Sequence, residues 1–522
     1  MFSPFVDLHT HTTNSDGRLS PRELINAAYD AGIRVLAITD HNLTETLVDL
    51  RAEFPEMQLI QGSEVSAIYY DGAGVDHEVH IVALGFDPED AGMRKLLADH
   101  QPDRRPYIER ILAKLRENEI DLGTYDDIVK RFPDTKYIGR MALARCLFED
   151  GYTDSVDQSF DIYLSAHGAR KAYVKNPLRY ASLDEVVRTI IHASGIPILG
   201  HLLMYDLDNG NRTGGEEKER LVTYFKQLVD YYGGVAGIEV YYTRYGMEDR
   251  LYLLKMARKH GLLISAGSDF HQQEAWETLH HRISASVADD LLKRLGVKVD
   301  YDVKPTELYV VSGASGVGKG TICKKLAGVD VNSKPIEVIK SVTTRSPRSE
   351  NENYTFLTKE RFMELATHHQ LLEHNNAYSG NGYGTPVGAV RTAIEGGKSP
   401  LLEIDRVGLC RLLTEGKINP ALIKSVFIVA PAAETARRLY LRGTENDQAI
   451  LKRLATSVFE VGFLHLYDAV VVNDNIEQAV LDTVHTFEGI CKESLFDVKA
   501  FQNEMEDIIF NWDQWKENLL SQ

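Results

Sequence analysis

Clusters of potential metal ligands follow the short apolar segments in the first half of the chain. They are the stretches 7–11 (DLHTH), 15–17 (SDG), 39–41 (TDH), 62–64 (GSE), 77–80 (HEVH), 200–201 (GH) and 267–271 (GSDFH). Imidazole together with carboxylate suits zinc, manganese or iron. Because many separate segments would have to acquire such residues independently, we interpret the series as one metal centre.

The spacing within these stretches indicates how the ligands would be used. His9 and His11 lie two residues apart, so in a strand they share a face and can reach the same ion. A carboxylate such as Glu64 can bridge two ions, and a paired-metal site clamps a phosphate and lowers the pKa of a bound water. This chemistry predicts the hydrolysis of a phosphoester.

Two of the stretches offer a choice of roles. His77 and His80 have opposite parity in a strand, and we favour His80 as the ligand. Asp40, beside His41, is expected to fix the orientation of a ligand ring rather than to bind an ion.

A glycine-rich phosphate loop lies in the second half of the chain. The segment 308–312 predicts a strand, and the sequence GASGVGKGT follows it. In such a loop the backbone N–H groups face phosphates, and the lysine neutralises their charge. The residues expected to bind ATP are Gly313, Ser315, Gly316, Gly318, Lys319, Gly320 and Thr321. Gly320 stands where serine or threonine usually coordinates Mg²⁺, so magnesium is expected to be held through water.

Strands that alternate with helices must position the first set of residues. The predicted strands are 5–9, 35–39, 59–61, 79–84, 196–199, 237–241 and 262–266. Ser20, Pro21 and Glu23 form a capping-box pattern that begins a helix, which is expected to end at Gly32. The alternation predicts parallel strands covered by helices, an α/β fold whose strand ends converge on one mouth if the sheet closes into a barrel. Residues 100–180 are more helical and are expected to form an insertion.

The pattern breaks between about residues 295 and 305, where glycine, lysine, aspartate and proline gather. We therefore predict a first domain at 1–295, a P-loop domain at 306–490 and an amphipathic, acidic tail at 491–522. The tail is expected to pack as a terminal helix rather than to dock a partner.

Composition narrows the class of protein. The net charge of −18 argues against wrapping long nucleic acid, although a metal centre or phosphate loop can still bind a small anion. There is no apolar run long enough to span a membrane, no secretory leader is visible, and the four cysteines form no metal-binding pair. These features predict a cytoplasmic enzyme.

The motifs HTHTTNSDG, AITDH, GSE, GH and GSDFH resemble the successive motifs of the polymerase and histidinol phosphatase (PHP) family over roughly residues 1–290. The resemblance implies a distorted βα barrel with two or three divalent ions, commonly manganese, iron or zinc. The ligands that it implies are His9, His11, Asp16, His41, Glu64, His80, His201, Asp269 and His271.

The most similar branch of that family contains nucleotide and small-molecule phosphoesterases and a short-RNA 5′→3′ exonuclease. Its inserted helical segment carries an arginine and, two residues later, a histidine that contact phosphate. Here Arg140 is present, but Ala142 replaces the histidine, and Leu202 replaces the proline that usually follows His201. Arg140 is expected to hold a substrate phosphate, with a surface ion pair as the alternative.

The second half resembles guanylate kinases over about residues 306–490. The matching segments are 341–348 (SVTTRSPR), 380–385 (GNGYGT), 404–408 (IDRVG), 442–445 (RGTE) and 472–474 (VND). The spacing departs at two places: the stretch between Arg348 and Tyr354 is shorter than usual, and one residue is inserted between Glu373 and Thr385.

This resemblance implies roles for residues on both sides of a kinase reaction. Arg345, Arg348, Tyr354 and Tyr383 would hold the acceptor monophosphate, and Ser341, Glu373, Thr385 and Asp405 would read the guanine edge. Arg438, Arg442 and Arg453, with Lys319, would stabilise the transferring phosphoryl group. Charge neutralisation and positioning are what in-line phosphoryl transfer requires.

We therefore expect a bifunctional enzyme of nucleotide metabolism. The front domain would hydrolyse a phosphoester of a nucleotide or sugar phosphate, and the back domain would phosphorylate GMP or dGMP with ATP and magnesium. One alternative is a front domain that acts as a 5′→3′ exonuclease on short oligonucleotides. Another is a phosphatase regulated by a nucleotide-sensing kinase-like domain that is not catalytic.

Overall fold

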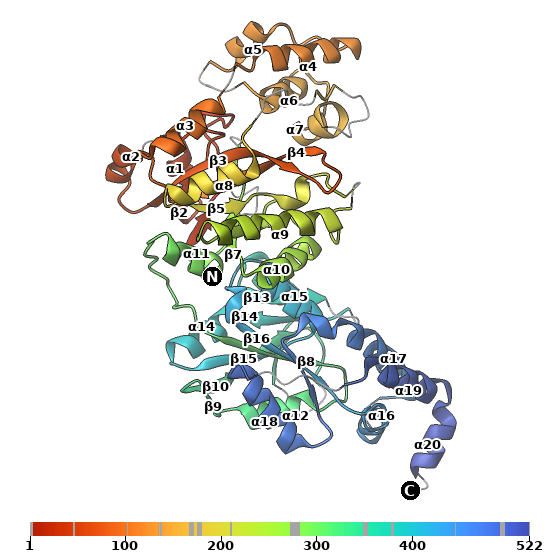
Figure 1. Cartoon of the computed structure of the whole chain (residues 1–522). Coiled ribbons are helices and arrows are strands. Elements are labelled where there is room, and N and C mark those ends of the chain that lie inside the picture. The colour runs from red at the N-terminus through yellow and green to blue at the C-terminus, as the bar shows by residue number, and fades with distance from the viewer. Residues whose placement is uncertain are drawn as a thin grey trace. The chain divides into compact units, whose positions relative to one another are not determined.

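The computed structural model describes residues 4–520, apart from 45–46, 102, 134, 136–137, 166–171, 175–179, 209–210, 272–281, 348–352, 377–379, 444 and 491–495. It divides into two compact units, the first ending at Asp300 and the second beginning at Tyr301. Figure 1 shows the elements of each unit, and the units are described separately below.

The first unit is built on a seven-stranded sheet whose spatial order follows the chain. Its strands are β1 (Phe5–Asp7), β2 (Ile33–Ile38), β3 (Gln58–Tyr70), β4 (Asp76–Leu84), β5 (Ile196–Leu199), β6 (Gly237–Tyr242) and β7 (Leu263–Gly267). The two edges approach each other, since the backbone N–H of Leu8 donates to the carbonyl of Ala266 at 2.9 Å. The sheet is therefore strongly curved, as a barrel-like fold requires.

The prediction of parallel strands is wrong for one strand. β4 runs antiparallel to both β3 and β5, whereas the other neighbours are parallel. β3 is also far longer than predicted, because it continues past Glu64 and pairs with β4 in a long hairpin, from Gly62 with Leu84 to Tyr70 with Asp76. A short connection between two strands permits only this antiparallel pairing.

Helices cover the sheet and form the expected insertion. The covering helices are α1 (Pro21–Asp30), α2 (Val48–Glu53), α3 (Ala91–Asp99), α8 (Leu183–His192), α9 (Glu216–Tyr231), α10 (Met247–His260) and α11 (Asp289–Arg294), with short 3-10 turns η2 (Leu202–Met204) and η3 (Ala285–Ala288). The insertion contains α4 (Arg105–Glu117), α5 (Tyr125–Arg131), α6 (Arg140–Glu149), α7 (Val156–Ser159) and the π-helix η1 (Phe160–Leu164). The insertion has its own apolar core, which includes Ile108, Ile111 and Leu143. The capping box at Ser20 is present as predicted.

The second unit contains two sheets. The larger has the order β17-β16-β8-β15-β10-β9 and the smaller the order β12-β11-β14-β13. The strands are β8 (Leu308–Gly313), β9 (Asp330–Val331), β10 (Lys334–Val338), β11 (Ser341–Thr343), β12 (Tyr354–Phe356), β13 (Leu371–Asn376), β14 (Gly382–Pro386), β15 (Ser399–Glu403), β16 (Ile423–Val429) and β17 (Ala469–Val472). β8 lies between β16 and β15 and is parallel to both, so the loop after it opens at the carboxyl edge of the sheet.

Helices flank these sheets and continue to the end of the described chain. They are α12 (Lys319–Leu326), α13 (Lys359–Thr367), α14 (Val387–Glu395), α15 (Arg406–Thr414), α16 (Ala432–Leu441), α17 (Asp447–Glu460), α18 (Ile476–Phe487), α19 (Val498–Phe510) and α20 (Trp512–Leu520), with 3-10 turns η4 (Pro420–Leu422) and η5 (Val461–Leu466). α19 packs against α16 and α17. None of the helices in the described part of the chain combines the length and apolarity needed to cross a bilayer.

Candidate active sites

Glu64, buried within β3, is the centre of the first site. Its Oε1 lies 2.8 Å from His80 Nδ1, 2.8 Å from His201 Nε2 and 3.4 Å from His9 Nε2. Its Oε2 lies 2.8 Å from His41 Nδ1 and 3.4 Å from His11 Nε2. One carboxylate thus faces imidazoles from four different strands or the loops that follow them.

The remaining predicted ligands complete the same cluster. Asp269 Oδ1 lies 3.1 Å from His11 Nε2, and Asp16 Oδ1 lies 3.1 Å from His271 Nε2. Asp16 Oδ2 is also 3.4 Å from His41 Nε2. The structure therefore brings together every residue that the sequence predicts as a metal ligand. His77, the rejected alternative to His80, instead pairs with Asp71 at 2.9 Å.

The donor set fits more than one divalent ion. The ligand atoms form three overlapping groups: His11, Asp16, His41 and His271; His9, His11 and Glu64; and His41, Glu64 and His80. Among the described residues, buried His9 Nε2, His11 Nε2, Asp16 Oδ1 and Glu64 Oε2 make no hydrogen bond of suitable angle, although atoms of opposite charge lie 2.8–3.4 Å away. Buried polar atoms are rarely left unsatisfied, so these atoms are arranged for ligands other than protein groups.

Opposite charges are strongly coupled in the metal-free cluster. Burial alone would raise the pKa of the Glu64 carboxyl, but the imidazoles of His80, His41 and His9 hold it well below its usual value. Burial, followed by the neighbouring His271, lowers the pKa of His11 to about 4, so this ring stays neutral. Although burial opposes the shifts, nearby carboxylates raise the pKa values of His9, His41, His80 and His271, so a metal ion would displace protons from these rings.

Glu239, on β6, was not predicted from the sequence. Its Oε1 lies 3.0 Å from His9 Nδ1, and its Oε2 accepts the backbone N–H of His201 at 2.8 Å. A carboxylate that accepts from the ring nitrogen that does not bind the metal fixes the tautomer and the orientation of a ligand histidine. The available signal was a glutamate in the otherwise apolar stretch GIEVYY.

Asp40 binds the loop that follows His11. Its carboxylate accepts the backbone N–H of Thr12 at 2.7 Å and the hydroxyls of Thr12 and Ser15 at 2.6 and 2.5 Å. It therefore shapes the loop that carries Asp16, and it reaches a ligand ring indirectly, because Ser15 Oγ lies 3.4 Å from His11 Nδ1.

Arg145 connects the helical insertion to the metal-ligand cluster. This α6 side chain is 2% exposed, and its Nη2 donates to the carbonyls of Asp16 and His271 at 2.9 and 2.6 Å. It thus fixes the backbone of two predicted ligands that come from opposite ends of the unit.

A basic region borders the cluster on the side of His80. Glu78 Oε1 lies 3.5 Å from His80 Nε2. Although burial opposes the shift, His80, Arg140 and Arg104 lower the pKa of Glu78 to about 2. Arg140, the first residue of α6, also lies 5.7 Å from the centre of the Tyr173 ring, and Arg104 donates to the Tyr180 hydroxyl at 3.0 Å. Ala142, where the resemblance implies a histidine, is buried in the core of the insertion.

Unusual backbone conformations occur at two ligands. His201 and Asp269 have φ values of 23° and 55°, which non-glycine residues seldom adopt. Gly267, two residues before Asp269, allows close packing, since a Cβ there would lie 2.3 Å from His9 Cβ and 2.4 Å from Glu239 Oε1. Local strain of this kind clusters at functional sites.

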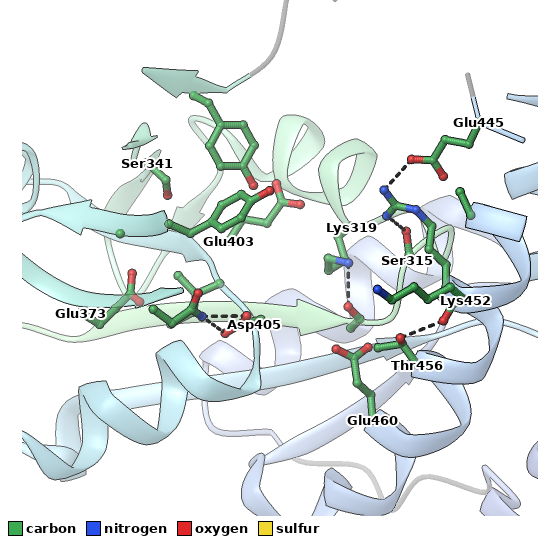
Figure 2. A pocket seen from close by; sticks show the side chains of 18 residues that line it. Ser315, Lys319, Ser341, Glu373, Glu403, Asp405, Glu445, Lys452, Thr456 and Glu460 are labelled. Atoms are coloured by element: carbon green, nitrogen blue, oxygen red, sulfur yellow. Dashed lines mark hydrogen bonds and ion pairs between the residues drawn. The ribbon is translucent and has the colours of Figure 1, made fainter. Parts of the chain in front are cut away.

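The second site is a cavity of about 410 Å³ at the carboxyl edge of the larger sheet. Figure 2 shows Ser341, Glu373 and Asp405 on one side and Ser315, Lys319, Lys452 and Glu445 on the other. The predicted residues that line it are Gly313, Ser315, Lys319, Ser341, Tyr354, Glu373, Tyr383, Asp405 and Arg453. Glu403, Asn375, Glu445, Lys452 and Glu460 also line it and were not predicted.

Cations gather at the phosphate loop. Lys319 Nζ donates to the carbonyls of Gly313 and Ala314 at 2.6 and 2.8 Å. Arg453 Nη1 donates to Ser315 Oγ at 2.8 Å, and Arg438 Nη1 to the Val317 carbonyl at 3.3 Å.

Other residues predicted at this end lie outside the cavity lining. Gly316 and Gly318 have φ values of 88° and 94°, as tight phosphate-loop turns require. Gly320 and Thr321 lie in the first turn of α12, and Arg442 is the exposed residue that follows α16.

Glu373 and Asp405 are the acidic groups at the other end. Burial raises the pKa of Glu373 to about 7, although its Oε1 accepts the hydroxyl of Thr385 at 2.7 Å. Asp405 caps α15 by accepting the Gly408 N–H, and each of its carboxylate oxygens lies 2.8 Å from the donor Asn375 Nδ2. Asp405 is thus already held by the protein, whereas Glu373 has an oxygen that takes no part in the Thr385 bond.

Aromatic rings adjoin the end of the cavity that contains Glu373. Tyr354 and Tyr383 pack edge to face with centroids 6.0 Å apart, and the Arg345 guanidinium lies 5.0 Å from the Tyr354 centroid. Arg348 lies outside the described residues.

Two enzyme classes are defined by these sites: a metal-dependent phosphoesterase in the first unit and a P-loop nucleotide kinase in the second. The PHP domain model matches residues 7–243, and the guanylate kinase model matches residues 305–488. The chain accordingly belongs to the PHP family through its first unit and to the guanylate kinase family through its second.

Two relatives, one for each unit, agree with this division. The chain is 31% identical over 286 residues to the 5′-3′ exoribonuclease Rnm of Salmonella typhimurium, covering 54% of this chain and 90% of that protein. It is 37% identical over 179 residues to the guanylate kinase of Mycoplasmoides gallisepticum, covering 34% of this chain and 88% of that protein. A solved amidohydrolase from Chromobacterium violaceum is 30% identical with a TM-score of 0.43, covering 53% of this chain and 96% of that one.

Proposed function

We propose that the first unit hydrolyses the phosphoester bond of a 5′-phosphorylated nucleotide or short RNA, and that the second unit phosphorylates GMP or dGMP with ATP. The convergence of His9, His11, Glu64 and their partner ligands carries the hydrolase half of the proposal. The cavity that joins a phosphate loop to a buried carboxylate carries the kinase half.

In the first unit, the predicted ligand set would hold two or three divalent ions, with manganese, iron or zinc as the proposed metals. Such ions neutralise phosphate charge and activate water for attack on phosphorus. Arg140 and Arg104 lie beyond His80, where a guanidinium can hold a phosphate that is not being cleaved. Glu239 and Arg145 keep the ligands in place while the ester bond breaks.

Short RNA is favoured over long RNA as the substrate of this unit. The resemblance to a protein named 5′-3′ exoribonuclease supports a phosphodiester substrate. The net charge of −18 opposes binding along an extended polyanion. A small nucleotide monoester is the second candidate, because the same basic region could hold either terminal phosphate.

In the second unit, Lys319, Arg438 and Arg453 would neutralise the transferring phosphoryl group. Glu373 lies at the opposite end of the cavity, where its carboxylate can accept N–H groups of guanine. Hydrolysis from a 5′ end releases nucleoside 5′-monophosphates, and GMP is the compound that a guanylate kinase consumes. The two activities would then form consecutive steps of nucleotide recovery.

The test supplies the whole protein with Mn²⁺, Mg²⁺, ATP and a 5′-phosphorylated guanine dinucleotide, and follows GMP and GDP. We expect GMP to appear first and GDP afterwards. His11→Ala should abolish the release of GMP but leave phosphorylation of added GMP intact, and Lys319→Ala should do the reverse. The hydrolase proposal is wrong if no dinucleotide or mononucleotide ester is cleaved, and the kinase proposal is wrong if no monophosphate yields ADP.

A further inference from the structure

Helix α17 has two chemically distinct faces. Ala449, Lys452, Arg453, Thr456 and Glu460 line the nucleotide cavity at helical spacing. On the other side of the helix, Ile450 and Leu454 are buried in an apolar cluster, and the Val458 carbonyl accepts a hydrogen bond from outside the helix. The position of the cavity face is therefore set by whatever packs on the opposite face.

Helix α16 is arranged in the same way. Arg438 reaches the phosphate loop at the Val317 carbonyl, 3.3 Å away. Two residues later, on another side of the helix, Tyr440 packs edge to face on Trp512 of α20 with centroids 6.0 Å apart. The two helices that carry the predicted phosphoryl-stabilising arginines thus share one outer support.

That support is the terminal helix pair. Phe501, Met505, Ile508 and Trp512 recur at helical spacing, are almost completely buried and belong to the same apolar cluster as Leu439, Ile450 and Leu454. Figure 1 shows α19 lying alongside α17, and α19 packs against α16 as well. Phe510, on the same helix, is 90% exposed and marks the side that takes no part in this packing.

Polar contacts fix the register of the pair. Gln502 Nε2 donates to the Val458 carbonyl of α17 at 3.0 Å, and Glu504 Oε1 accepts the Ala433 N–H of α16 at 3.3 Å. Lys516 of α20 forms an ion pair with Asp447, the first residue of α17. Apolar packing alone would permit sliding, whereas these directional bonds define one arrangement.

We propose that α19 and α20 are a positioning element for the kinase reaction, which holds Arg438 and Arg453 over the phosphate loop before ATP binds. The guanylate kinase match ends at residue 488, so this element lies beyond the part of the chain that the family accounts for. Arg453 is already bonded to Ser315 of the loop, as the preset arrangement requires. The inference rests on the proposed kinase function of this unit.

The test compares Met505→Ala, which removes a fully buried contact of α19, with Phe510→Ala, which truncates an exposed apolar residue of the same helix. Gln502→Ala, which removes one directional bond, is the milder second variant. The readouts are hydrogen exchange of residues 432–460 without nucleotide, and the KM values for ATP and GMP in the whole protein.

We expect Met505→Ala to speed exchange in both arginine-bearing helices. If the competent fraction falls to about a tenth, the KM for ATP rises about tenfold. The KM for GMP should not change, because Ser341, Glu373 and Tyr383 belong to other elements. Gln502→Ala should give the same pattern more weakly, and Phe510→Ala should match the wild type.

The proposal is overturned if a folded Met505→Ala matches Phe510→Ala in exchange and in the KM for ATP. It is equally overturned if the KM values for ATP and GMP rise together, since that is the result of general destabilisation. Should Met505→Ala fail to fold, Gln502→Ala decides by the same readouts. If the wild type forms no ADP, the kinase assignment fails while the exchange data still test the support of α16 and α17.

Discussion

Replacing Glu239 by glutamine should weaken metal binding without changing the shape of the first unit. Glu239 accepts on both sides, from His9 Nδ1–H and from the His201 backbone N–H. Since His9 Nε2 faces Glu64 and Asp269, the ring proton must lie on Nδ1 for the ring to serve as a ligand. Glutamine has one oxygen and one NH₂ group, so one of these two donors must meet another donor.

The magnitude follows from that mismatch. Glu239 is 1% exposed, so water cannot replace the lost acceptor, and a buried unsatisfied donor costs about 1–3 kcal/mol. This range corresponds to about 5- to 150-fold weaker metal binding, which brackets the effect of about 10- to 100-fold that is usual for losing such a partner of a ligand histidine.

The affinity of the metal-free protein for Mn²⁺, measured by calorimetry or chelator competition, provides the assay. Glu248→Gln, on the exposed surface of α10, is the matched control because it makes the same chemical change in the same unit. Kinase activity provides an internal check that the protein is intact. Wild-type Mn²⁺ affinity in Glu239→Gln would refute the reasoning, because His9 would then need no carboxylate behind it.

Further variants test other contacts. Arg145→Met removes the donor to the carbonyls of two predicted ligands, so the free energy of unfolding of the first unit without metal should fall by about 1–3 kcal/mol. Thermal melts should place Arg145→Lys between this variant and the wild type. Gly267→Ala places a Cβ 2.3 Å from that of His9, so elemental analysis should find bound metal lost while GMP phosphorylation persists. Burial raises the pKa of Glu373 to about 7 from 4.5, so the folded unit keeps this proton where the unfolded chain has released it. The contribution of Glu373 to the free energy of unfolding therefore falls by about 3 kcal/mol as the pH rises from 4.5 to about 7. Glu373→Gln should remove the fall, and thermal melts at about pH 5 and pH 8 would check this by the difference from wild type.

The ligand cluster was predictable because each ligand can be recognised from its own short segment of sequence. Each ligand follows or lies in an apolar strand, and a curved sheet brings strand ends to one place. The phosphate loop was equally accessible, since a strand, a glycine loop and a helix occur consecutively at Leu308–Leu326.

The features that the sequence did not predict depend on contacts between distant segments. Glu239 looks like a misplaced charge in a strand until β6 is placed beside the loop that carries His9. Arg145 reads as an ordinary helix residue until α6 lies against Asp16 and His271. The long β3–β4 hairpin was missed because the predicted strand 59–61 ends before Glu64, whereas Glu64 lies inside a strand that continues to Tyr70.

The central claim is that the histidines and carboxylates of the first unit form a single site for several ions. His11, His41 and Glu64 each belong to two of the three ligand groups, and Glu64 is the one among them whose carboxylate can bridge two ions. Two measurements test this claim directly: the number of ions bound per chain, and the electron paramagnetic resonance spectrum of the Mn²⁺-loaded protein. We predict two or three ions per chain with magnetically coupled spectra, and loss of the coupling in Glu64→Ala. A single uncoupled ion in the wild type, or an unchanged coupled signal in Glu64→Ala, would contradict it.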